Sequence, residues 1–138
     1  MGRYYSLNNG TEGKFGFGIQ GSRDAEIFGL SPVSITMATY DKEPVEKKLK
    51  ELLDKVGEEY NEEIARGDCD EVRRKYMELE ARVRKRYNLP NYAWSSEATK
   101  EENERTEEYS LILNRIYMGV QIMNCLLTDE NCYMDCEL

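Results

Sequence analysis

Alternating and helical hydrophobic patterns divide the chain into a β-rich part and a helical part. Short alternating stretches predict strands over 4–7, 14–20 and 33–40, with a turn at 8–10. Within the second of these strands, aromatic and aliphatic residues share one face while two glycines line the other. The segment 25–28 fits no element type clearly. Together these strands predict a small antiparallel sheet.

Further along the chain, apolar residues recur at helical spacing. Pro44, which is tolerated in a first helical turn, marks the start of a helix whose apolar stripe continues to Ile64 and stops at Gly67. Asp68 is suited to cap a second helix, which ends before Pro90. We expect these two helices, of about twenty residues each, to form a long hairpin.

The last helix has the most apolar stripe in the chain. Thr99 and Glu102 have the spacing of a capping box, in which each side chain binds the backbone of the other residue. Eight apolar residues then recur at helical spacing: Tyr109, Ile112, Leu113, Ile116, Tyr117, Val120, Met123 and Leu127. The tail, 128–138, is predicted to fold back onto the helices through Tyr133 and Met134. Deleting 132–138 would then cost little stability, with most of the cost coming from Tyr133.

Length and glycine distribution lead to the expected fold class. The chain has 138 residues and a mass of 16.1 kDa, the size of one domain. Seven of its ten glycines and all three phenylalanines lie within the first 29 residues. We therefore predict an α+β fold in a single domain, 1–138, with a β-rich part at 1–42 and a helical part at 43–138. The helical stripes exceed what a three-stranded sheet can cover, which favours a homodimer.

Composition narrows the function classes. The net charge is −8 and there is no histidine, so the commonest general base and the usual catalytic zinc ligand are missing. We therefore expect a non-enzymatic protein without a cofactor. An acidic chain is also poorly suited to bind nucleic acid directly. We find neither a signal peptide nor a run of about 18 apolar residues, and so expect a soluble protein that is neither secreted nor inserted in a membrane.

Acidic residues gather toward the C-terminus. Residues 90–138 contain ten acidic and three basic side chains and contribute −7 to the net charge. On one continuous helix, four glutamates would align along one side: Glu97, Glu101, Glu104 and Glu108. Their separations resemble those of successive phosphates, so this surface could imitate nucleic acid toward a basic groove of a partner protein. Tyr92 and Trp94 have amphipathic rings suited to the same interface. The simpler alternative is a solvated helix start, where the helix dipole favours negative charge.

The glycines at 16–21 form a G-x-G-x-x-G string. A dinucleotide-binding fingerprint needs such a string between a strand and a helix of a βαβ unit, which this pattern of elements does not provide. The backbone N–H groups around Gly16, Gly18 and Gly21, with Arg23 nearby, could instead bind an anion such as a nucleotide phosphate. The rings of Tyr5 or Trp94 would then stack on the base. A strand followed by a tight bend is the alternative.

The chain contains four cysteines: Cys69, Cys125, Cys132 and Cys136. Their spacing matches no paired C-x-x-C motif, and no histidine is present to complete a mixed site, so no metal site is predicted. A metal bound by the three C-terminal thiols with Asp135 or Cys69 stays open as an alternative. We expect small buried side chains with one or two exposed thiols.

Three N-terminal segments carry a resemblance: Gly2–Ser6, Gly13–Gln20 and Ser22–Gly29. They resemble the start of small uncharacterised proteins encoded by phages and viral contigs, a likeness that covers about 30 of the 138 residues. No activity is assigned to that family. The resemblance implies a viral protein in the host cytoplasm, similar in character to phage-encoded inhibitors of host defence such as anti-CRISPR proteins, which act by binding.

Two functional hypotheses result. The first is a phage-encoded inhibitor that binds a host protein or protein complex through the acidic surface, where the target itself binds nucleic acid. The alternative is a protein that sequesters a nucleotide second messenger at the glycine-rich bend.

Overall fold

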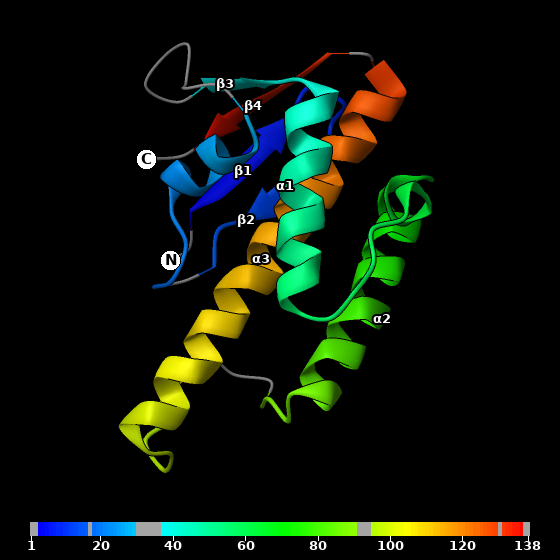
Figure 1. Cartoon of the computed structure of the whole chain (residues 1–138). Helices are drawn as coiled ribbons and strands as arrows, with labels where there is room; N and C mark the ends of the chain where they lie inside the picture. Colours follow the sequence, from blue (N-terminus) through cyan, green and yellow to red (C-terminus); the bar gives the residue numbers. More distant parts are fainter. Residues whose placement is uncertain (1–2, 17, 30–36, 91–94, 130, 137–138) are drawn as a thin grey trace.

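The computed structural model describes residues 3–16, 18–29, 37–90, 95–129 and 131–136. They form a four-stranded antiparallel sheet with helices packed against one of its faces (Figure 1). The strands are β1 (Tyr4–Leu7), β2 (Glu12–Lys14), β3 (Met37–Tyr40) and β4 (Cys132–Cys136). The α-helices are α1 (Lys42–Lys55), α2 (Cys69–Arg86) and α3 (Lys100–Asp129), and the 3-10 helices are η1 (Ser22–Phe28) and η2 (Glu62–Ala65). The predicted α+β class is confirmed.

The last strand of the chain lies inside the sheet. The strand order is β2-β1-β4-β3, so β4 pairs with β1 on one side and with β3 on the other. Met134 stands opposite Leu7 of β1 and Ala38 of β3. The sheet therefore closes only when the C-terminal tail has joined it.

The tail folds back as predicted and Met134 docks in the core, but the prediction was wrong in naming the helices as its main partner and Tyr133 as its main anchor. Cys132, Met134 and Cys136 are buried, whereas Tyr133 keeps 46% of its surface exposed. This alternation is the pattern of a strand that covers a core with one face only. Because β4 is paired on both sides, its removal would disrupt the sheet rather than cost a modest amount of stability.

The second predicted strand is shorter than expected. The chain leaves the sheet after Lys14, so β2 covers Glu12–Lys14 instead of 14–20. Phe15 turns into the core, where its ring meets the Tyr5 ring edge-on at 5.0 Å. Gly18 then adopts a φ of +75°, which glycine tolerates far better than other residues. Of the strand predicted at 33–40, 37–40 forms β3, and 33–36 lies outside the described residues.

The first helix also ends earlier than its apolar stripe suggests. α1 stops at Lys55, and Gly57 takes a φ of +74°, the left-handed conformation in which helices commonly end. Residues as far as Ile64 keep their helical spacing, but they lie in the return segment that contains η2. The start of α2 is as predicted, because the Glu71 N–H donates to Asp68 Oδ1 at 2.9 Å.

The prediction that the first two helices form a hairpin is wrong, because α1 and α2 run in the same direction, whereas the helices of a hairpin run in opposite directions. At one end, Arg86 Nη1 donates to the Val56 carbonyl at 2.7 Å. At the other end, Lys42 forms an ion pair of 2.9 Å with Glu62, just before α2 begins. The segment between the helices therefore returns along α1, as Figure 1 shows, and both helices pack against the oppositely directed α3.

α3 supplies most of the helical core. Every residue from Leu113 to Leu126 is at least partly buried, and the crossing with α1 and η1 occurs at Gly119. A Cβ at Gly119 would lie 2.4 Å from the Phe28 ring and 2.7 Å from Leu49, so the close approach requires glycine. By length and composition α3 could cross a membrane, but 61% of its most apolar stretch is buried inside this fold. α3 therefore acts as a core helix here.

Candidate functional site

The acidic surface is formed by the N-terminal third of α3. Glu101, Glu104 and Glu108 are exposed and follow one another at three- and four-residue spacing, which places them on one side of the helix. Glu97 is exposed but precedes the helix, because Thr99 is the capping residue. The predicted alignment of four glutamates on one helix is therefore correct for three of them. From here on, "acidic surface" means Glu101, Glu104 and Glu108.

Local contacts hold this end of α3 in place. The predicted capping box is present: the Glu102 N–H donates to Thr99 Oγ1 at 3.1 Å, and the Thr99 N–H donates to Glu102 Oε2 at 3.3 Å. Asn103 exchanges two hydrogen bonds of 2.8 Å with the backbone of Ser95. The segment that precedes the helix is thereby fixed against it, which gives the acidic surface a defined shape.

Few cations neutralise the acidic surface. Lys100 approaches Glu104 at 3.9 Å, and it is the single ion-pair partner of the three glutamates within the described residues. Arg105 points away, donating to the Tyr87 carbonyl at 2.9 Å and lying 5.2 Å from the Tyr109 ring. Tyr92 and Trp94, the predicted aromatic neighbours, lie outside the described residues.

The glycine-rich bend is occupied by the protein's own side chains. The Gly16 N–H donates to Gln20 Oε1 at 2.9 Å, and the Gly21 N–H donates to Asp24 Oδ2 at 2.7 Å. The other oxygen of Asp24 forms an ion pair of 2.6 Å with Arg115. A carboxylate of the chain thus stands where the phosphate of a ligand would bind.

The remaining residues of the nucleotide hypothesis are not gathered into a pocket. Arg23 and Gly18 are exposed, and a Cβ placed on Gly18 would have no described atom within 4 Å. Tyr5 is 3% exposed and donates its hydroxyl hydrogen bond to Gln121. Its ring packs in the core and is not available to stack on a base.

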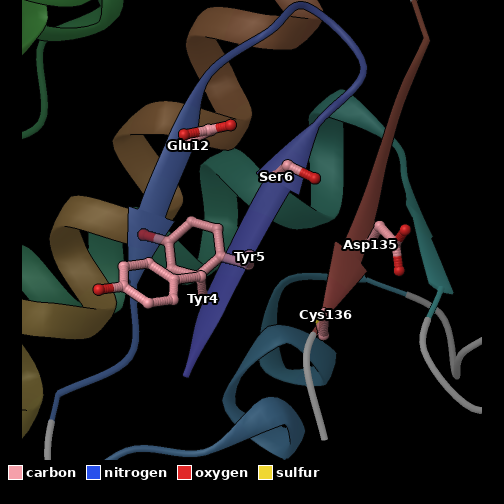
Figure 2. A pocket seen from close by; sticks show the side chains of 6 residues that line it. All are labelled: Tyr4, Tyr5, Ser6, Glu12, Asp135 and Cys136. Carbon is pink, nitrogen blue, oxygen red and sulfur yellow. The ribbon is translucent and has the colours of Figure 1, made fainter. Parts of the chain in front are cut away.

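A second candidate surface is a hollow on the face of the sheet away from the helices. Figure 2 shows side chains from three strands around it, with Tyr4 and Ser6 on β1, Glu12 on β2 and Asp135 on β4. Ser6 is directly opposite both Glu12 and Asp135 in the strand registers. The hollow has a volume of about 410 Å³.

The chemistry of the sheet hollow supports binding of a cationic group. The carboxylates of Glu12 and Asp135 flank the Ser6 hydroxyl, so the three can accept hydrogen bonds from an ammonium or guanidinium group. Both carboxylates are exposed and the hollow is open to water, which weakens such contacts. Sequence reasoning missed this site, although the alternation at 132–136 is a local signal for a strand.

Three of the four thiols are enclosed in the core. Burial raises the pKa of Cys125 and of Cys132, and it raises the pKa of Cys136 to about 11. Cys69, in the first turn of α2, is exposed. Asp135 lies on the sheet face opposite Cys132 and Cys136. Across the described part of the chain, no three side chains of the usual ligand types come together to hold a metal ion.

Comparison with known proteins supplies no relative. The chain matches no protein-family model, no curated protein and no solved structure. The N-terminal resemblance to phage proteins stays a prediction.

Proposed function

We propose that this protein is a non-enzymatic binding protein that presents its acidic surface to a basic, nucleic-acid-binding partner. Its viral resemblance makes a bacterial defence protein or complex the partner to test first. The protein would inhibit that target by occupying the groove that otherwise receives nucleic acid.

The observation that supports this proposal is the sparsely neutralised charge of Glu101, Glu104 and Glu108 on one side of α3. Consecutive members of this set are about 4.5 and 6 Å apart along the helix axis. A basic groove built to bind a phosphate backbone also meets negative charges at intervals of a few ångströms. Charge complementarity of this kind raises association rates and selects partners.

The acidic surface is held rigidly. The capping box and the Asn103 bonds to Ser95 fix the segment before the helix, so little conformational freedom is lost when a partner binds. The nearby Arg105 donates to the Tyr87 carbonyl, just after α2, and forms no ion pair with the acidic surface within the described residues.

The alternative, a protein that sequesters a nucleotide second messenger, has weaker support. Asp24 already accepts the Gly21 N–H, and Tyr5 is buried. A nucleotide that binds only the folded state raises the melting temperature, and the stabilisation grows with the logarithm of the nucleotide concentration relative to its dissociation constant. A melting screen with cyclic and linear nucleotides tests this alternative directly, and a clear upward shift would favour it over the acidic surface.

Affinity capture tests the proposal. The wild-type chain is immobilised and exposed to bacterial cell extract beside the variant E101K/E104K/E108K. We expect the wild type to retain nucleic-acid-binding proteins that duplex DNA releases, and we expect the reversed variant to retain none of them.

A matched variant controls for net charge. E26K/E43K/E59K changes the net charge equally, at exposed glutamates for which the described structure records no ion pair. It should retain the same proteins as the wild type. Equal retention by the wild type and E101K/E104K/E108K would contradict the proposal, because binding would then occur elsewhere.

A further inference from the structure

The outer edge of β2 can accept another strand. Among the described residues β2 pairs only with β1, in the register Tyr4 to Lys14, Tyr5 to Gly13 and Ser6 to Glu12. The Phe15 N–H donates to the Arg3 carbonyl at 2.9 Å, just beyond the strand. In an antiparallel pair, hydrogen-bonded and non-hydrogen-bonded positions alternate. The backbone groups of Gly13 therefore face β1, and those of Glu12 and Lys14 face outward.

This edge borders a groove, and at its start Thr11 Oγ1 lies 3.4 Å from Cys69 Sγ of α2. The groove has a volume of about 430 Å³ and is lined by β2, by the first turn of α2 and by Tyr117, Gln121 and Asn124 of α3. The Glu12 carbonyl accepts one hydrogen bond of 3.3 Å from Gln121 Nε2 and keeps a second lone pair. An exposed edge with outward backbone donors and acceptors is a template for strand pairing.

We propose that two copies of this chain pair through β2, antiparallel and centred on Gly13, to form one continuous eight-stranded sheet. In that register, Glu12 of one copy lies opposite Lys14 of the other, and the reverse pair forms across the two-fold axis. Both pairs are hydrogen-bonded positions, because Glu12 and Lys14 are the residues whose backbone groups face outward.

The charges of Glu12 and Lys14 favour a second copy of this chain as the partner strand at this edge. Each of the two cross-strand pairs joins a carboxylate to an ammonium group, and opposite charges directly across a strand pair stabilise it. The symmetric arrangement is isologous, the commonest form of a homodimer. A register shifted by two residues would lose both charge pairs, because it places Glu12 opposite Glu12 or Lys14 opposite Lys14 of the other copy.

Gly13 suits the centre of this interface. It lies opposite Gly13 of the other copy at a non-hydrogen-bonded position, where the two backbones come closest. On the helix side its Cβ position is filled by the Tyr5 ring, at 2.1 Å from Tyr5 Cζ, so the position requires glycine within one chain as well.

A charge swap tests the proposal on the full chain. Sedimentation velocity at low salt, from about 1 µM to 1 mM, spans the affinities expected for a small interface. We expect the wild type to approach twice its mass of 16.1 kDa as concentration rises. Glu12→Lys and Lys14→Glu should each stay monomeric, because like charges then face each other. The double variant E12K/K14E should dimerise again, because both pairs are restored with reversed sign.

Two variants control for the change in charge. Lys47→Glu and Glu59→Lys make the same charge changes at exposed positions away from β2 and should dimerise like the wild type. Circular dichroism verifies that every variant is folded. A wild type that stays monomeric at all concentrations would overturn the proposal, even if the edge then bound a peptide. Single variants that dimerise like the wild type would also overturn the proposal. A double variant that stays monomeric would do the same.

Discussion

The two ends of α3 differ in what surrounds them. Toward the C-terminus, from Leu113 to Leu126, the helix is buried among the sheet, α1 and α2. Toward the N-terminus its outer side is acidic and exposed, and even its buried positions are polar: Asn103, Thr106 and Ser110. One continuous helix thus combines a core segment with a segment that adds little to the core.

We therefore expect the C-terminal half of α3 to determine stability and the N-terminal third to determine partner binding. Apolar burial dominates folding free energy, so changes around the C-terminal half of α3 should destabilise the protein. Substitutions of exposed charges usually alter stability by less than about 0.5 kcal/mol, so changes on the acidic surface should leave the fold intact.

Removal of 132–138 should abolish cooperative folding, because β4 pairs with both neighbours and contributes three buried side chains. Urea unfolding followed by circular dichroism provides the measurement. Met134→Ala is the milder version and should cost about 2–5 kcal/mol. Tyr133→Ala, on the exposed face, should cost less than about 1 kcal/mol. A truncated chain with the wild-type midpoint would show that β4 is not structural.

Gly119→Ala should destabilise the crossing of α3 with α1 and η1. Alanine favours a helix by about 1 kcal/mol over glycine, but its Cβ would overlap Phe28 and Leu49. Overpacking of this kind typically costs about 1–3 kcal/mol. Gly21→Ala is a matched control, since the nearest atom to its Cβ is 3.4 Å away, on Arg3. Greater stability in Gly119→Ala than in the wild type would mean that the core there is loosely packed.

Glu58 should make stability depend on pH. Burial disfavours its charged form, but hydrogen bonds from Arg82 and Arg86, at 2.7 Å each, lower its pKa overall. A lowered pKa adds stability above the unfolded-state pKa of about 4.3, and this stability is lost as pH falls through the folded value. At pH 7, the free energy of unfolding of the wild type should exceed that of Glu58→Gln by about 1 kcal/mol. Urea unfolding should show the gap closing below pH 4, and a constant gap would contradict the assignment.

The exposed thiol should react faster than the three buried thiols. At pH 8, one thiol per chain, that of Cys69, should react quickly with a disulfide reagent, because it is the exposed one. Cys125, Cys132 and Cys136 should react only on unfolding, since burial raises their pKa values and limits access. Cys69→Ser should abolish the fast phase. Two or more fast thiols would show that the sheet opens readily.

Local signals predicted the helix starts well. Asp68 and the pair Thr99 and Glu102 cap α2 and α3 as their spacing indicates, because capping involves residues within one turn. The same capping box should have excluded Glu97 from the helix. The stripe continuing to Ile64 was misleading, since periodicity does not reveal that Gly57 reverses the chain.

The larger errors of the predictions from sequence involve contacts between residues that are far apart in the chain. The alternation Cys132–Cys136 was visible, but its place between β1 and β3 depends on contacts with the opposite end of the chain. The sheet hollow could not be predicted for the same reason, because Asp135 reaches Ser6 only through β4. The occupation of the glycine-rich bend by Asp24 could not be predicted either, because Asp24 is held by an ion pair with Arg115, a residue distant in the sequence.

Displacement of nucleic acid tests the central claim most directly. A protein captured by the wild-type chain is loaded with fluorescently labelled duplex DNA, and anisotropy is followed as the chain is added. We predict that the wild type and E26K/E43K/E59K release the DNA, while E101K/E104K/E108K, folded to the same stability, does not. Release by the reversed variant, or a stable complex of DNA, partner and wild-type chain together, would contradict the account.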